Sequence, residues 1–168
     1  MPARHIIMFI LAGTLFSTEQ HQIEPPADFG FVFEYGVCST NTLDTFTGWF
    51  RRQPGEPGRE PVTTQISLTG SQMLYIYQTI EEIGFFGYPS VYASLPLGFA
   101  ATRTATGFPR YRLEVRSRAV FHSVQWEDRV HPTTSEADRL RRLFGWIVAF
   151  INSDRLVRRL PHAASDCE

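Results

Sequence analysis

The chain has 168 residues, enough for one domain with a substantial hydrophobic core and too few for two ordinary domains. A hydrophobic content of 43% with 20% charged residues is typical of a globular protein and excludes an intrinsically disordered one. The net charge of -1 excludes a strong nonspecific attraction to nucleic acid, because that attraction needs clustered and uncompensated basic charge.

The first 17 residues have the pattern of an export signal. Basic residues precede an apolar run over residues 6–16, which is shorter than the ~20 residues that span a bilayer. Leu15 is large for its place before a cleavage site, and Thr14 stands where a lipoprotein would carry its lipid-bearing cysteine. We expect export, with two alternatives open: cleavage near Ser17, or retention of residues 1–17 as a shallow membrane anchor. The anchor would be formed by Ile6, Ile7, Phe9, Ile10, Leu11, Leu15 and Phe16.

The next part of the chain predicts a tether followed by three strands. Residues 18–28 are polar and contain prolines, which favours a tether. Aromatic side chains then alternate with other residues over 29–35, which predicts a strand with one apolar face. The threonine- and aromatic-rich segment 39–50 predicts a second strand, and alternation over 62–68 predicts a third. Proline and glycine make residues 53–61 a loop.

A helix is predicted over residues 70–83. Thr69 and Gln72 have the spacing of a capping box, apolar residues recur every three or four positions, and Gly84 can end the helix. Residues 87–109 show little periodicity and almost no charge. They predict a long irregular loop, and such a loop is more often a binding segment than a spacer.

Two alternating segments that meet at Ser117-Arg118 predict a hairpin with one solvent-exposed face. On that face a basic ladder is expected, with Glu114 among its arginines, which are Arg110, Arg112, Arg116 and Arg118. The ladder could hold an acidic partner or lipid headgroups, or it could only prevent unwanted strand pairing. Thr133 and Glu136 then begin a terminal helix that runs to about Asn152.

The predicted order β-β-β-α-β-β-α indicates an α+β fold: an antiparallel sheet of about five strands with two helices packed on one face. The domain is expected to cover residues 29–160, with residues 161–168 as a tail.

This succession resembles a group of exported bacterial proteins of unknown function, many of which are lipoproteins. The resemblance covers residues 29 to about 160 and is carried by the strand ending in Ile66-Ser67-Leu68-Thr69 and by the helix closing in Glu81-Glu82-Ile83-Gly84-Phe85-Phe86-Gly87-Tyr88-Pro89. Thr14 departs from the lipidated members. The resemblance implies a fold and an extracytoplasmic, periplasmic compartment. It implies no site residue.

No catalytic, cofactor-binding or metal site is predicted, because no spaced motif occurs. His122 falls on the apolar face of its strand, where a hydrogen-bonded core histidine is the expected role. If the chain is an enzyme, its candidate catalytic residues are His122, His131 and Asp44. The two cysteines, Cys38 and Cys167, could pair in an exported protein or remain thiols.

The terminal helix carries more apolar surface than one core-facing stripe needs. Leu140, Leu143, Phe144, Ile147 and Ile151 fill that stripe and leave Trp146 and Phe150 on a neighbouring face. We expect partner binding by these two rings together with Arg139, Arg142, Arg155, Arg158, Arg159, Tyr92, Leu95, Leu97 and Phe99.

The resulting hypothesis is a non-catalytic exported interaction module, an accessory subunit of a membrane-associated envelope complex such as a respiratory or photosynthetic one. Its expected partners are protein subunits and, through the N-terminus, the membrane surface. The alternatives are a stand-alone periplasmic ligand-binding or inhibitory domain and, third, an enzyme.

Overall fold

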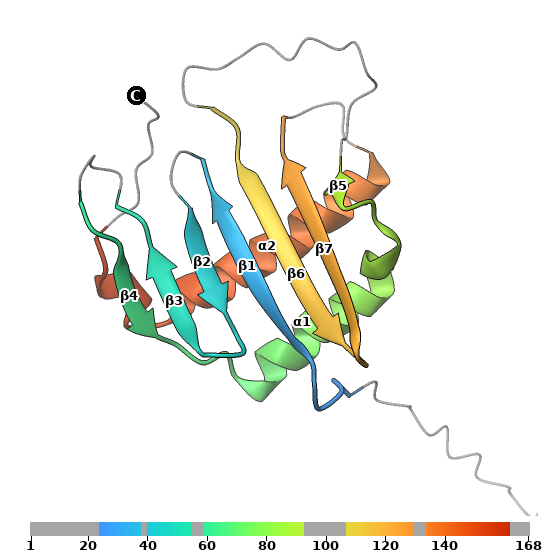
Figure 1. Cartoon of the computed structure of the whole chain (residues 1–168), viewed down its shortest axis with the longest axis horizontal. Helices are drawn as coiled ribbons and strands as arrows, with labels where there is room; N and C mark the ends of the chain where they lie inside the picture. Colours follow the sequence, from blue (N-terminus) through green and yellow to red (C-terminus); the bar gives the residue numbers. More distant parts are fainter. Residues whose placement is uncertain (1–23, 38–39, 55–58, 93–106, 130–133, 162–168) are drawn as a thin grey trace, which may run out of the picture.

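The computed structural model describes residues 24–37, 40–54, 59–92, 107–129 and 134–161. In these ranges the chain forms one sheet of seven strands, and two helices lie across one face of it (Figure 1). The strands are β1 (Gly30–Gly36), β2 (Asn41–Asp44), β3 (Trp49–Arg52), β4 (Val62–Gln65), β5 (Val91–Tyr92), β6 (Arg110–Ser117) and β7 (Val120–Glu127). The helices are α1 (Gly70–Ile83) and α2 (Ser135–Ser153), with 3-10 turns η1 (Phe85–Gly87) and η2 (Val157–Arg159). The predicted α+β class is confirmed.

The sheet differs from the predicted one in strand number and in direction. Its order is β4-β3-β2-β1-β6-β7-β5, and each neighbouring pair is antiparallel except β5, which runs parallel to β7. The expectation of about five antiparallel strands is therefore wrong, because two additional short strands were not recognised.

The first additional strand arises because segment 39–50 contains a turn. The Asp44 carboxylate accepts hydrogen bonds from the backbone N–H groups of Phe46 (2.8 Å) and Thr47 (3.3 Å), which is an Asx-type turn. Gly48 follows with φ +73°, a conformation that favours glycine. The predicted single strand is thus the hairpin of β2 and β3.

The second additional strand lies inside the predicted irregular loop 87–109. η1 ends at Gly87, and the Ser90 carbonyl then accepts a hydrogen bond from Gln125 N at 2.8 Å, which begins the pairing of β5 with β7. The start of this segment is therefore ordered against the sheet edge. Three residues predicted to bind a partner fall outside the described residues: Leu95, Leu97 and Phe99.

Both helices begin at threonine caps. At α1 the predicted capping box is present: Thr69 Oγ1 accepts from Gln72 N at 3.2 Å, and Thr69 N donates to Gln72 Oε1 at 2.8 Å. Gly84 ends this helix with φ +66°. At α2 the cap is Thr134 and not Thr133, since Thr134 Oγ1 accepts from Ala137 N at 3.1 Å.

The core lies between the sheet and the helices. Alternate residues of β1, β6 and β7 point into it, as in the fully buried Phe33, Leu113 and Trp126. The opposite face of the sheet is not covered by either helix (Figure 1). No helix in the described ranges is both long enough and apolar enough to cross a bilayer.

Candidate functional site

The outer surface of the helix layer carries three aromatic rings in mutual contact. Trp146 and Phe150 of α2 lie one turn apart with ring centroids 5.9 Å from each other. Tyr75 of α1 meets both, at 5.3 Å from Trp146 and 6.1 Å from Phe150. Trp146 is 42% exposed and Tyr75 is 40% exposed, whereas Phe150 is half-buried against the core. We call these three residues the helix patch.

The helix patch exists because α2 buries a different stripe. The five residues predicted for the core stripe are all buried, and they occupy the side of α2 that faces the sheet. Trp146 and Phe150 lie on the flank toward α1. Tyr75 was not recognised from the sequence, although its position outside the apolar stripe of α1 was the available signal.

Arginines stand at both ends of this surface. Arg139 and Arg142 precede Trp146 by about two turns and one turn on α2, and both are exposed. The other three predicted arginines follow the helix and are also exposed: Arg155, Arg158 and Arg159. The surface is therefore apolar in the middle and basic at its ends.

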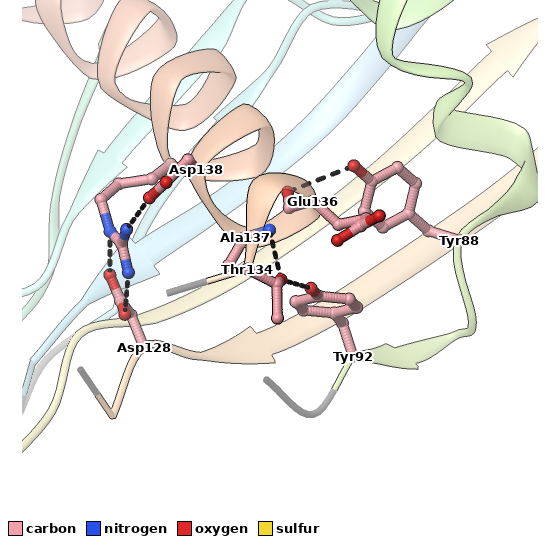
Figure 2. Close-up of polar contacts among 8 residues, drawn as sticks. Tyr88, Tyr92, Asp128, Thr134, Glu136, Ala137 and Asp138 are labelled. Atoms are coloured by element: carbon pink, nitrogen blue, oxygen red, sulfur yellow. Dashed lines mark hydrogen bonds and ion pairs between the residues drawn. The ribbon is translucent and has the colours of Figure 1, made fainter. Parts of the chain in front are cut away.

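A polar cluster fixes the N-terminal end of α2 to the sheet (Figure 2). Asp128 is 5% exposed, and its carboxylate accepts two hydrogen bonds from Arg141, at 2.8 Å from Nε and 2.7 Å from Nη2. Arg141 also reaches Asp138 at 2.7 Å and lies over the Trp126 ring, 5.3 Å from its centroid. The hydrogen bond to Asp128 is the main reason why the pKa of Arg141 is raised.

Two tyrosines complete this end of the helix. The Tyr92 hydroxyl contacts Thr134 Oγ1 at 2.8 Å, and the Tyr88 hydroxyl donates to the Glu136 carbonyl at 3.2 Å (Figure 2). The Tyr92 ring also packs edge-on against Trp126. Tyr92 was expected to bind a partner, but its hydroxyl and ring are used in contacts within the domain.

The described catalytic candidates do not meet. His122 Nε2 lies 2.9 Å from the Tyr88 carbonyl oxygen, which only accepts, so Nε2 carries the proton of this hydrogen bond. The imidazole also packs edge-on against Phe85. Asp44 is used in the β2–β3 turn, three strands away, which is roughly 14 Å at normal strand spacing. His131 and Cys38 fall outside the described residues, as does Cys167.

The predicted arginine ladder is present only in part. Arg110 lies 3.6 Å from Glu127, Arg112 is paired with Glu34 and Glu114, and Arg116 lies 3.9 Å from Asp28. These three arginines are on the open face of the sheet, but each faces an acid. Besides the expected Glu114, three further acids therefore accompany the arginines of this face: Glu34, Glu127 and Asp28.

Arg118 does not belong to that ladder, because it forms the turn. Arg118 and Ala119 have φ values of 51° and 60°, and Arg118 Nη2 donates to the Tyr77 hydroxyl of α1 at 2.8 Å. The turn is therefore Arg118-Ala119 and not Ser117-Arg118, and it directs this arginine toward the helix layer.

A shallow cavity of about 150 Å³ opens near the end of β1 and the start of β6. Glu34, Arg110, Arg112 and Gln125 contribute polar groups to its wall. Within the described ranges no group of three His, Cys, Asp or Glu side chains is placed to hold a metal ion.

The geometry consists of an exposed aromatic surface on the helices, a buried polar cluster that serves the fold, and an open sheet face on which Arg110, Arg112 and Arg116 each lie near an acid. Comparison with known proteins adds no assignment to this description, since the chain matches no family model and no curated protein sequence.

Proposed function

We propose that this chain is a non-catalytic, exported interaction module that is tethered by its N-terminal segment and serves as an accessory subunit of a membrane-associated envelope complex. The observation that carries the proposal is the helix patch. Three rings in mutual contact stand together on the outer side of α1 and α2; Trp146 and Tyr75 are exposed, and Phe150 is partly buried beside them. Exposed aromatic clusters of this kind are enriched at the energetic centre of protein interfaces.

The chemistry of the partner follows from the helix patch and its flanks. The partner's surface should offer an apolar recess for Trp146, bordered by acidic side chains that complement Arg139 and Arg142 at one end and the three later arginines at the other. A respiratory or photosynthetic complex is a suitable host class.

A catalytic role is a weaker proposal because the described catalytic candidates and the buried Asp128 are each used in contacts within the domain. Both carboxylate oxygens of Asp128 accept from Arg141, and the acid is almost fully buried, so this pair serves to hold α2 against the sheet. His122 and Asp44 serve packing and turn formation.

A stand-alone periplasmic ligand-binding or inhibitory domain is the second candidate. The cavity beside Glu34 and Arg112 favours it, since both charges could contact a small polar ligand. Its volume of about 150 Å³ is smaller than the roughly 300 Å³ at which small-molecule sites usually begin, so we rank this function second.

Export would also allow Cys38 and Cys167 to form a disulfide. Arg52 Nη1 donates to the carbonyls of Val157 and Pro161, both at 3.3 Å, and its guanidinium lies beside the Tyr35 hydroxyl, near the β1–β2 connection that contains Cys38. Five residues lie between Pro161 and Cys167, so Cys167 can reach up to about 20 Å from Pro161. Thiol titration of the native exported protein under denaturing conditions should find no free thiol, and two free thiols would refute this pairing.

The test of the main proposal is recovery of protein partners from detergent-solubilised membranes. The double substitution Trp146→Ser with Phe150→Ser should abolish recovery of partners that the wild-type chain retains. Val91→Ser is the control, because Val91 is an exposed apolar residue outside the helix patch. Circular dichroism checks that the double variant is folded. Unchanged recovery with a folded double variant would contradict the proposal.

A further inference from the structure

Exposed apolar side chains are concentrated at one end of the sheet. Among the described residues, eight large hydrophobic side chains are exposed, and four of them belong to this end. We call these four the turn-end patch: Phe46, Trp49, Val120 and Phe121. They come from the β2–β3 turn and from the start of β7, which lie at the same end of the sheet (Figure 1).

The strand register brings two of the rings onto one row of the open face. The Phe46 ring lies over Gly30, in the space that a side chain would occupy there, so a larger residue at this position would displace the ring. Gly30 pairs with Arg116, and Arg116 pairs with Phe121. Phe46 and Phe121 therefore flank Arg116, with Phe121 64% exposed.

The N-terminal segment reaches the domain at this same end. The Asp28 carboxylate accepts hydrogen bonds from the backbone N–H groups of Arg118 (2.9 Å) and Ala119 (2.7 Å). The chain that precedes β1 is thereby fixed to the β6–β7 turn. Between the apolar run 6–16 and the first described residue, Glu24, lie seven residues, which can span at most about 25 Å.

We infer that the turn-end patch rests on the surface of a lipid bilayer, with its rings in the headgroup region and with Arg116 at the level of the phosphates. The inference rests on the proposed tethering, because an apolar run 6–16 held in the bilayer keeps this end of the domain within about 25 Å of the lipid. Aromatic and arginine side chains are suited to the interface between hydrocarbon and water.

We favour lipid over a protein partner because the N-terminal tether reaches the domain at this end. We favour insertion of the rings over attraction between charges because acids offset part of the positive charge here. Arg116 is 3.9 Å from Asp28, so the positive charge at this end is partly neutralised. Binding should therefore depend more on the exposed rings than on anionic lipid. In this orientation the helix patch, on the opposite face of the sheet, stays accessible to a protein.

Two tryptophans of similar exposure provide matched probes of the orientation. Trp49 in the turn-end patch is 47% exposed and Trp146 in the helix patch is 42% exposed. The third tryptophan, Trp126, is buried and is present in both variant proteins. The full-length Trp146→Phe protein reports Trp49, and the full-length Trp49→Phe protein reports Trp146. Each is mixed with phosphatidylcholine–phosphatidylglycerol vesicles that contain brominated acyl chains.

Quenching by brominated lipid should be at least twofold stronger in the Trp146→Phe protein than in the Trp49→Phe protein. Equal quenching, stronger quenching of Trp146, or no association with vesicles would overturn the inference. These outcomes leave the partner recovery experiment intact, because that experiment is done in detergent and depends on the helix patch.

A second measurement tests how much Phe46 and Phe121 contribute to vesicle binding. Phe46→Ser with Phe121→Ser should lower the vesicle partition coefficient about tenfold, since two aromatic side chains lose their burial in the interface, whereas Val91→Ser should leave it unchanged. Far-UV circular dichroism confirms that the double variant is folded. An unchanged partition coefficient overturns the inference, and loss of a protein partner by the same variant would assign the surface to a protein contact.

Discussion

The two ends of α2 use their side chains in opposite ways. At its N-terminal end, Asp128 and Arg141 hold a buried, doubly hydrogen-bonded pair that anchors the helix to β7. Further along the same helix, Trp146 stands on the surface beside Tyr75, with two-fifths of its area exposed to solvent. The charged groups serve the fold, and the apolar ring remains available for contact.

This difference indicates where function resides in the molecule. In an enzyme, buried charged groups are often the reactive ones, because burial and neighbouring charges shift their pKa values toward the working pH. Here the Asp128 carboxylate and Arg141 form an ion pair, and the exposed side chain further along the helix is aromatic. The comparison agrees with the proposed recognition role, and it leads to stability predictions that separate the two ends of the helix.

The largest effect on stability is expected from Asp128→Asn. The substitution removes the charge of a buried carboxylate, but the Arg141 side chain is 33% exposed and keeps Asp138 as a partner, so we expect the free energy of unfolding to fall by about 2–3 kcal/mol, less than for a fully buried pair. Asp138→Asn is the control, because that carboxylate is half exposed and its loss should lower the free energy of unfolding by about 1 kcal/mol or less. Urea denaturation of both variants measures their free energies of unfolding. Equal decreases would show that Asp128 contributes no more to stability than the exposed Asp138.

Trp146→Ser should have a smaller effect on the isolated domain. A buried tryptophan contributes about 3–5 kcal/mol, but this side chain retains only its contacts with Tyr75, Phe150 and the flank of α2. We expect the free energy of unfolding to fall by about 1–2 kcal/mol, less than for Asp128→Asn. A decrease above that of Asp128→Asn would show that Trp146 is a core residue, and it would weaken the proposal that it serves recognition.

A region could be predicted from the sequence when the contacts that fix its structure join residues close together in the chain. The helix α1 was predicted over its full length because its cap at Thr69 and its stop at Gly84 are local signals. The strand β5 was missed because two residues are ordered only by pairing with β7, more than thirty residues away in sequence. For the same reason, the hydrogen-bonded role of His122 could be expected, but its partner, the Tyr88 carbonyl, could not.

The candidate site shows the same limit. Trp146 could be placed on the surface from helical spacing alone, but Phe150 is partly buried against the core. Tyr75 joins them only through the packing of α1 against α2. The turn-end patch could not be recognised at all, since Phe46 and Phe121 are far apart in sequence and become neighbours through the registers of β1 with β6 and of β6 with β7.

A smaller effect, opposite in sign, is expected at the β6–β7 turn. Ala119 has φ +60°, which is unfavourable for a residue with a side chain, so Ala119→Gly should raise the free energy of unfolding by about 0.5–1 kcal/mol. The same substitution in an exposed, regular part of α2, Ala149→Gly, should lower it by about 1 kcal/mol. Thermal or urea denaturation tests the pair. Destabilisation by both would mean that the turn has a different backbone conformation.

The last and smallest effect is the pH dependence contributed by Asp28. The backbone N–H of Ala119 is the main group that lowers the pKa of this carboxyl below its ordinary value of 3.8, with the Arg118 N–H acting in the same direction. A carboxyl with a lowered pKa in the folded state stabilises the protein above its ordinary pKa, and this contribution disappears as the pH falls through the folded-state pKa. The urea midpoint of the wild type should therefore exceed that of Asp28→Asn at pH 7, and the gap should narrow below about pH 4. The Ala119→Gly protein keeps both N–H donors and should follow the wild-type pH profile. A gap that stays constant down to pH 2 would show that the Asp28 charge has no part in fixing the N-terminal segment to the turn.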